Sequence, residues 1–232
     1  MSHDTFCTAL TYDTENKPAG IYIVKRELFE SLNPEKPTDM TEDIIHEAVK
    51  SGEAVLLDGK GYYKRITTPE AFLDCQRHML YNENMSQRLT ENNFSGAAIG
   101  EPVYIGENVS VMSGSVIESG SVIDNNAVVK GGKVNGYVGI GSVVSERCDI
   151  NSAVVCRGAV LDSGVKCGEY SVIGEKAHIA SEAVIEKGVG IWSGKTVEKG
   201  VRLYENVKRS SDSRLVICLL YTSDAADEGL GV

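Results

Sequence analysis

The sequence predicts a mainly β protein whose principal part is a parallel β-helix. Between Ile99 and Leu203 an apolar residue recurs at nearly every sixth position, in two long registers. The first register is Ile99, Ile105, Val111, Ile117, Ile123 and Val129, and the second is Val155, Leu161, Cys167, Ile173, Ile179, Ile185, Ile191, Val197 and Leu203. A repeat of six fits neither the 3.6-residue period of a helix nor the two-residue period of a strand, so each hexad must turn a regular corner. We expect triangular coils with these side chains pointing inward.

A second repeat supports the same fold. Two residues before the inward positions stand small or β-branched side chains: Val103, Val109, Ser115, Ser121, Ala127, Ala153, Ala159, Val165, Ser171, Ala177 and Ala183. Glycine and asparagine recur near the expected corners, where tight turns need their backbone freedom. Coils of about 18 residues would stack at the strand spacing of ~4.8 Å, which places each inward side chain on another one coil away. Residues 99–208 would form five to six such coils.

The hexad register changes once, between Val129 and Val155. In this interval the apolar residues Val138, Val144 and Ile150 are also six positions apart, but they fit neither of the two registers. Glycines lie at the start of the interval, within Lys130-Gly131-Gly132-Lys133. We expect these four residues to bulge out of the coil as a small loop.

Residues 1–90 are expected to be part of an α/β domain, followed by a linker over residues 91–98. The pattern predicts strands at 20–24, 54–58 and 62–66, helices at 26–32 and 69–80, and a helix capped by Asp39 or Thr41 and ended by Gly52. Three helices and three strands make a poor stand-alone core at this length. We therefore expect that a further segment precedes them in the natural protein.

The C-terminal tail, residues 209–232, does not continue the hexads. From Cys218 to Glu228 it reads CLLYTSDAADE, which resembles the translation of an adapter used in sequencing libraries. We interpret residues 218–232 as a read-through artefact and exclude them from functional arguments. Without them the chain has 23 basic and 30 acidic residues, and its net charge changes from −10 to −7.

Composition excludes several classes of function. The acidic balance without a basic run argues against nucleic-acid or membrane-surface partners, and no apolar stretch approaches the ~20 residues that cross a bilayer. The cysteines show no C-x-x-C pair and the four histidines are scattered, so no metal site is predicted. We expect a cytoplasmic protein with reduced thiols.

Several segments carry a family resemblance. The order A-G-I-Y-I, D-M-T-E-D-I-I, G-Y-Y-K-R-I-T-T-P-E-A-F-L and then hexads resembles sugar-phosphate nucleotidyltransferases. The segment from Gly190 to Gly200, G-I-W-S-G-K-T-V-E-K-G, is similar to the closing coil of the mannose-1-phosphate guanylyltransferase group. The resemblance covers residues 15–208. It implies that residues 1–90 are the C-terminal part of a nucleotidyltransferase domain and that the β-helix is left-handed, an exception to the usual hand of parallel crossovers.

The resemblance implies a nucleotide-sugar pyrophosphorylase. Such an enzyme joins a sugar 1-phosphate, here mannose 1-phosphate, to a nucleoside triphosphate, here GTP, with Mg²⁺ offsetting the phosphate charge. The family's phosphate loop and metal aspartate do not occur in this chain. We therefore expect the catalytic residues in a missing N-terminal half, a fragment that is inactive alone, and no Mg²⁺ bound by it. The substrate-binding candidates are Ala19, Gly20 and Arg65; Arg65 replaces a metal-binding aspartate and could hold a phosphate instead.

Two other functions stay open. The chain could belong to a non-catalytic regulatory homologue, or to a hexapeptide acyltransferase with a histidine base between subunits. His178 precedes the inward Ile179, and we expect it on an outer face as a solvated side chain. Trp192 and Lys195 either form a binding feature or, as we expect, Trp192 covers the apolar end of the last coil. We also expect a homo-oligomer formed through residues 99–203, because β-helices expose strand edges and flat faces.

Overall fold

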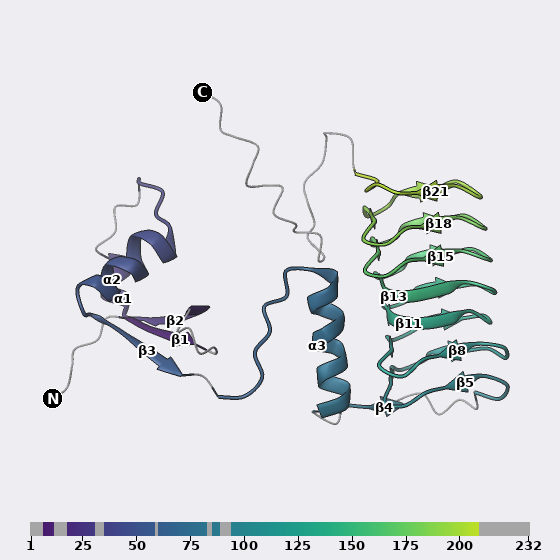
Figure 1. Ribbon diagram of the computed structural model, residues 1–232, viewed down its shortest axis with the longest axis horizontal. Helices are drawn as coiled ribbons and strands as arrows, with labels where there is room; N and C mark the ends of the chain where they lie inside the picture. The colour runs from purple at the N-terminus through teal and green to yellow at the C-terminus, as the bar shows by residue number, and fades with distance from the viewer. Residues whose placement is uncertain are drawn as a thin grey trace. The chain divides into compact units, whose positions relative to one another are not determined.

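A computed structural model describes residues 7–11, 18–30, 35–58, 60–82, 85–88 and 94–208 of the chain (Figure 1). Contacts divide the chain into two compact units, residues 1–65 and 66–232. The predicted tail, including the suspected artefact at 218–232, lies outside the described residues.

The first unit is a small sheet with helices against one face. The strands are β1 (Cys7–Thr11), β2 (Pro18–Val24) and β3 (Ala54–Asp58), in the order β2-β1-β3, with β1 antiparallel to β2 and parallel to β3. The helices are α1 (Arg26–Glu30), the π-helical turn η1 (Met40–Ile45) and α2 (His46–Lys50). Ile44, Ile45 and Ala48 are buried against a layer formed by Tyr22, Val24, Met40 and Ala54.

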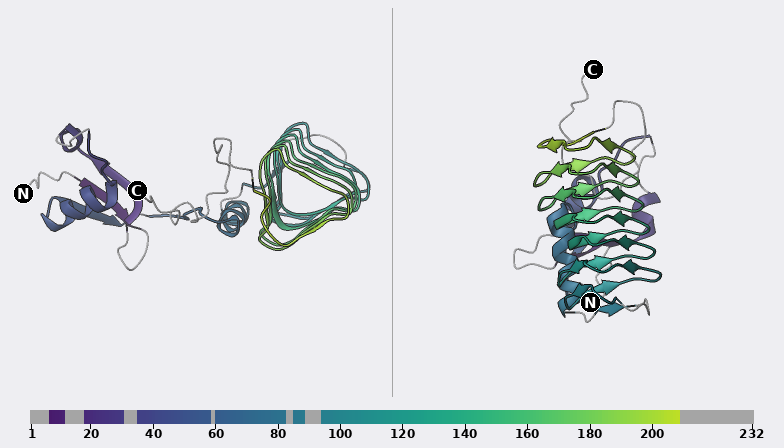
Figure 2. Two further views of the ribbon diagram at one scale, coloured as in Figure 1. Left: turned by 90° about the horizontal axis from the view of Figure 1, so that it is seen from above. Right: turned by 90° about the vertical axis from the view of Figure 1, so that its right-hand side faces the viewer.

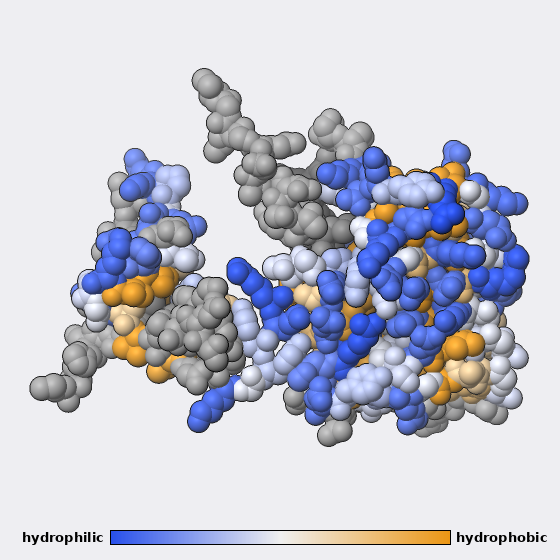
Figure 3. Space-filling view, viewed as in Figure 1, coloured by the Kyte–Doolittle hydropathy of each residue, from blue (hydrophilic) through white to orange (hydrophobic). Residues whose placement is uncertain are grey.

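The other face of this sheet is apolar and exposed. Side chains alternate along a strand, so the neighbours of Tyr22, Val24 and Ala54 point away from the helices. These neighbours, Ile21, Ile23, Val55 and Leu57, are exposed, and Figure 3 shows hydrophobic surface over the strands of this unit.

The local structure predicted for the first unit is confirmed in part. The predicted cap at Asp39 is confirmed: its carboxylate accepts a hydrogen bond from the Thr41 amide at 2.8 Å, and the Asp39 amide donates to Asp43 Oδ2 at 2.8 Å. The strand predicted at 62–66 is wrong, because these residues, all described, form no strand. The Tyr63 hydroxyl instead donates a hydrogen bond to the Ala19 carbonyl. The strand β1 was not predicted.

The second unit is a parallel β-solenoid of about six turns, which matches the expected left-handed β-helix. Figure 2 shows its triangular cross-section. It begins with α3 (Pro69–Asn82) and β4 (Gln87–Arg88). The coil strands are β5 (Ala98–Ile99), β6 (Tyr104–Ile105), β7 (Ser110–Val111), β8 (Val116–Ile117), β9 (Val122–Ile123), β10 (Val128–Val129), β11 (Lys133–Val138), β12 (Val143–Val144), β13 (Asp149–Val155), β14 (Val160–Leu161), β15 (Lys166–Cys167), β16 (Val172–Ile173), β17 (His178–Ile179), β18 (Val184–Ile185), β19 (Gly190–Ile191), β20 (Thr196–Val197) and β21 (Arg202–Leu203).

The predicted inward columns are confirmed. On one face the sheet order is β20-β17-β14-β12-β10-β7, and Leu161 pairs with Ile179, which pairs with Val197. We call this face the six-stranded face. Its inward residues Leu161 and Ile179 are fully buried. Cys167, in a strand of another face, also points inward and is 2% exposed. The other two faces are joined into one twelve-stranded sheet.

The register change has a different cause from the one predicted. Residues 130–133 do not leave the coil: the Lys130 amide donates to Val144 O and the Lys133 amide to Cys148 O. Instead a coil is shortened, because Ile105 pairs with Ile123 at a spacing of 18 residues, whereas Ile123 pairs with Val138 at a spacing of 15. A deletion within the repeat, rather than an inserted loop, therefore shifts the phase of the hexads.

The shortened coil removes a corner. Both β11 and β13 continue through it as single strands, with a register shift between Asn135 and Gly136. At Gly136 φ is +144°, and an added Cβ would lie 2.2 Å from Ala153 O. The close approach of these two strands therefore requires glycine at this position.

The helix α3 covers the β-helix at this place. Leu73 is 1% exposed and belongs to a cluster with Val154, Cys156 and Val172 of the β-helix. Phe72 meets Tyr137 edge-to-face at 5.3 Å between ring centroids. This helix falls within residues 1–90, expected as an α/β domain, but its apolar side packs on outward residues of the β-helix.

The last coil is closed by the chain that follows it. Val201, Leu203 and Val207 are partly buried against the core, and Val207 forms a bridge with Ile191. Trp192 is half-buried and does not belong to this cluster. The covering role predicted for Trp192 therefore falls to Val207 and its neighbours.

The columns give a direct stability prediction. Ile179→Asp places a carboxylate in a fully buried column without a partner, and we expect it to lower the free energy of unfolding by about 4 kcal/mol. Urea denaturation followed by circular dichroism measures this loss. The control is Thr196→Asp, an exposed position that changes stability little. Equal stability of both variants would contradict the inward position of Ile179.

A second prediction concerns the shortened coil. Gly136→Ala should destabilise the protein by about 3 kcal/mol, because the new methyl group collides with the Ala153 carbonyl. The matched control is Gly141→Ala, which also has a positive φ, +66°, but open space around the added Cβ, and which should cost about 1 kcal/mol. The same denaturation measurement compares the two, and a smaller loss for Gly136→Ala would contradict the close approach.

Candidate functional site

A histidine and a carboxylate meet on the six-stranded face. His178 Nε2 lies 3.0 Å from Asp162 Oδ2. Both side chains point outward, with exposed fractions of 47% for His178 and 36% for Asp162. We call these two residues the dyad.

The coil geometry explains why the two side chains meet. Val160 pairs with His178, and Leu161 with Ile179, so Asp162 lies two residues further along the same outer surface. Diagonal neighbours of this kind are within reach of long side chains. Asp162 and His178 are 16 residues apart in the sequence, two fewer than the 18 residues of a regular coil. The backbone of β17 is fixed from the other side, since the His178 amide donates to Lys195 O at 2.8 Å.

The contact defines the state of the imidazole. An ionised carboxylate only accepts hydrogen bonds, so Nε2 of His178 carries the hydrogen in this contact. In the neutral ring Nδ1 then has the free lone pair and can take a proton. A histidine whose ring is oriented by a carboxylate is the arrangement that general-base catalysis uses.

Apolar side chains lead up to the dyad on the same face. Val128, Val143 and Val160 form an outward row through successive strand pairs, and His178 and Thr196 continue it. The three valines are half-buried, whereas His178 and Thr196 are exposed. The dyad thus lies at the end of an apolar strip.

Polar links hold the corner next to Asp162. The Ser163 hydroxyl donates to Glu146 Oε2 at 3.1 Å, and Arg147 pairs with Glu182 at 3.1 Å. The first contact joins neighbouring coils and the second spans two coils. From the following coil the Glu182 amide also donates to Ser163 O at 3.0 Å. The turn that carries Asp162 is therefore fixed by its neighbours above and below.

The buried thiols are poor nucleophiles. Burial raises the pKa of the Cys148 thiol and of the Cys167 thiol above the usual cysteine range, so both stay protonated at neutral pH. Cys148 instead donates a hydrogen bond to the Asp162 carbonyl at 3.0 Å.

The predicted substrate-binding residues lie in the first unit. Ala19 and Gly20 are in β2, where Gly20 has a φ of +80°, and Arg65 is exposed at the end of the unit. The Tyr63 hydroxyl donates a hydrogen bond to the Ala19 carbonyl, and the dyad belongs to the second unit. Their substrate-binding role stays a prediction.

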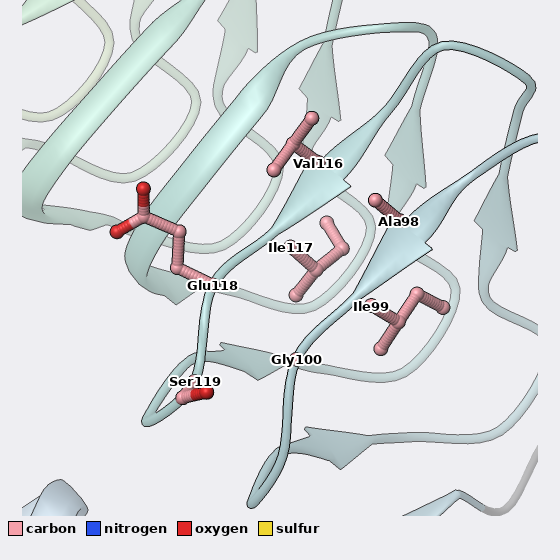
Figure 4. A pocket seen from close by; sticks show the side chains of 7 residues that line it. All are labelled: Ala98, Ile99, Gly100, Val116, Ile117, Glu118 and Ser119. Atoms are coloured by element: carbon pink, nitrogen blue, oxygen red, sulfur yellow. The ribbon is translucent and has the colours of Figure 1, made fainter.

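Two surface hollows of the second unit lack a histidine and are therefore weaker candidates for a catalytic site than the dyad. One, of about 490 Å³, lies between β5 and β8 near the start of the β-helix. Figure 4 shows Ile99 and Ile117 in its wall, with Glu118 as the charged lining residue, and Glu118 is engaged by Lys133 at 2.8 Å. The other, of about 580 Å³, lies at the last coil, where Lys187 contacts Glu169 at 2.7 Å. Neither includes the dyad.

No helix among the residues that the structure describes is long and apolar enough to cross a bilayer. In Figure 3 the visible face of the β-helix is largely hydrophilic, with smaller hydrophobic areas between the hydrophilic ones.

Comparison with known proteins finds similarity in structure only. No family model and no curated protein matches the chain. A histidine-to-alanine variant of GDP-perosamine N-acetyltransferase from Caulobacter crescentus, solved with CoA and GDP-perosamine, is 24% identical, with a TM-score of 0.34, over 49% of this chain and 47% of that chain. PerB from the same organism is 19% identical, with a TM-score of 0.30, over 69% and 70%. The acetyltransferase domain of PglB from Neisseria gonorrhoeae is 14% identical, with a TM-score of 0.27, over 84% and 91%.

These neighbours correct the predicted function. Two of them are named as acetyltransferases, the third was solved with CoA and GDP-perosamine, and none is named as a nucleotidyltransferase. The prediction of a mannose-1-phosphate guanylyltransferase, or of any nucleotide-sugar pyrophosphorylase, is contradicted. The hexads that carried much of that resemblance are common to many families, so they indicate the fold and leave the reaction open. The first of these matches spans about half of the solved protein.

The sequence alone identified half of the dyad. His178 was correctly expected on an outer face, but it was interpreted as a solvated side chain. Asp162 was not recognised at all. The sequence does contain a signal for it. Asp162 precedes His178 by 16 residues, two fewer than an 18-residue coil, and this spacing places a carboxylate diagonally next to the histidine on one face.

Proposed function

We propose that this chain is an acyltransferase in which His178 is the general base and Asp162 orients it. The observation that carries the proposal is the 3.0 Å contact between His178 Nε2 and Asp162 Oδ2 on the outer face of a hexapeptide β-helix. The contact leaves Nδ1 available to accept a proton from a nucleophile.

The reaction is the transfer of an acyl group from a thioester to an amine or hydroxyl. His178 Nδ1 takes the proton of the nucleophile as its nitrogen or oxygen attacks the thioester carbonyl. The tetrahedral intermediate collapses, the carbon–sulfur bond breaks, and the leaving thiolate receives the proton from the imidazolium. Asp162 stabilises the imidazolium through its carboxylate and keeps the ring in one orientation.

We infer from the exposed dyad that a second copy of the chain completes the site. Base catalysis gains from a site that excludes water, yet both dyad side chains are substantially exposed in one chain. The strip of Val128, Val143 and Val160 is an apolar surface that a second β-helix could cover. The homo-oligomer expected from the sequence would then use the six-stranded face.

The catalytic proposal is tested with acetyl-CoA and a panel of acceptors that includes nucleotide-linked amino sugars. His178→Asn should lower kcat by about 10²–10⁴-fold, because no base remains to take the proton, and Asp162→Asn should lower it to a smaller extent. Release of CoA thiol measures the rate. Lys166→Ala, an exposed position on another face, is the control with unchanged activity. Full activity of His178→Asn would refute the assignment.

The assembly is tested by light scattering of the whole chain at tens of micromolar. Val143→Glu places a charge in the apolar strip and should shift the mass toward the monomer, whereas Lys166→Glu should leave the oligomer intact. Circular dichroism confirms that both variants are folded. A monomeric wild-type protein, or an oligomer unaffected by Val143→Glu, would exclude this face as the interface.

A further inference from the structure

A buried thiol holds the backbone of the residue that carries the dyad carboxylate. Cys148 is 2% exposed, and two carbonyl oxygens lie within reach of its Sγ: that of Asp162, at 3.0 Å, is the nearer acceptor, and that of Leu161 lies at 3.9 Å. The turn's own hydrogen bond to the Asp162 oxygen, from the Val165 amide, is longer, at 3.4 Å. The thiol is therefore the nearer of the two donors that fix this carbonyl.

Similar contacts occur where coils are shorter than 18 residues. Among the described residues, four buried side chains donate to a carbonyl of the next coil: Ser115 to Val129, Ser121 to Val134, Ser142 to Cys156 and Cys148 to Asp162. By contrast, Ser171 lies in a regular 18-residue coil, and its hydroxyl has no hydrogen-bond partner. Of the four contacts, the one from Cys148 ends on a residue of the dyad.

The donor role of this thiol is stable around neutral pH. Desolvation raises the pKa of Cys148, so the S–H group remains protonated there. A carbonyl oxygen only accepts, which means that the hydrogen bond has one direction. Replacement by serine keeps a donor, whereas replacement by valine keeps a similar volume and removes the donor.

We propose that Cys148 is a positioning residue for the dyad: its hydrogen bond to the Asp162 carbonyl sets the direction from which the Asp162 carboxylate meets His178. Cys148 lies inside the coil and acts through Asp162, without contact to substrate. The role in catalysis rests on the acyltransferase function proposed above, but the effect on the His178 ring does not.

The first test observes the His178 ring itself. The ¹⁵N shifts of its two nitrogens report which one carries the hydrogen, and the signals are assigned by their loss in His178→Asn. The folded whole chain is compared as wild type, Cys148→Ser, Cys148→Val and Asp162→Asn. The matched control is Cys167→Val, which removes another buried thiol that is not a donor to Asp162.

The structure leads us to expect that Cys148→Val moves the His178 ring shifts by at least half of the change seen in Asp162→Asn. Cys148→Ser and Cys167→Val should keep the wild-type shifts. If Cys148→Val is too unstable to measure, Cys148→Ala replaces it in the same comparison. Wild-type ring shifts in the valine or alanine variant would overturn the inference.

The second test uses the rate of acetyl transfer. Cys148→Val should lower kcat about 10-fold with little change in KM, because a misplaced orienting group affects the transition state more than binding, and Cys148→Ser should restore the rate. If the wild type transfers no acetyl group, the proposed function fails, while the ring shifts still decide the role of Cys148. An active wild type with unchanged kcat in Cys148→Val would refute the catalytic part of the inference.

Discussion

The stacking of inward aliphatic side chains, one coil upon another, is the constraint on which the rest of this structure depends. Leu161, Ile179 and Val197 follow one another through adjacent strand pairs, and Leu161 and Ile179 are fully buried. Because side chains alternate along a strand, fixing these residues inward fixes their neighbours outward. His178 is on the surface because Ile179 is in the core, and the same column places Asp162 within its reach.

The shortened coil gives the β-helix its individual features. It merges two strands at the corner near Gly136, which brings the backbone of β11 against β13. The helix α3 packs over this region, with Gln76 donating to the carbonyls of Gly120 and Gly136 at 2.7 and 3.2 Å. One face of the prism is thereby covered within the chain, whereas the six-stranded face keeps the dyad exposed.

The repeating part of the fold could be predicted from the sequence because every hexad has the same pattern of one inward aliphatic residue with a small or β-branched residue two positions before it. The inward positions, the outer position of His178 and the cap at Asp39 follow from local patterns. The shortened coil could not be predicted in this way, since a missing corner and an extra loop shift the hexads alike. Asp162 was missed because its partner is one coil away, and the function was misassigned because short motifs such as the one around Trp192 indicate little about a reaction.

The central claim is that the surface around the dyad is where acyl transfer takes place. A crystal structure of the full chain with CoA tests it most directly. The account predicts that the CoA sulfur lies within about 4 Å of His178 Nδ1, close enough for proton exchange during thioester attack. Well-ordered CoA with its sulfur far from the six-stranded face would contradict the account.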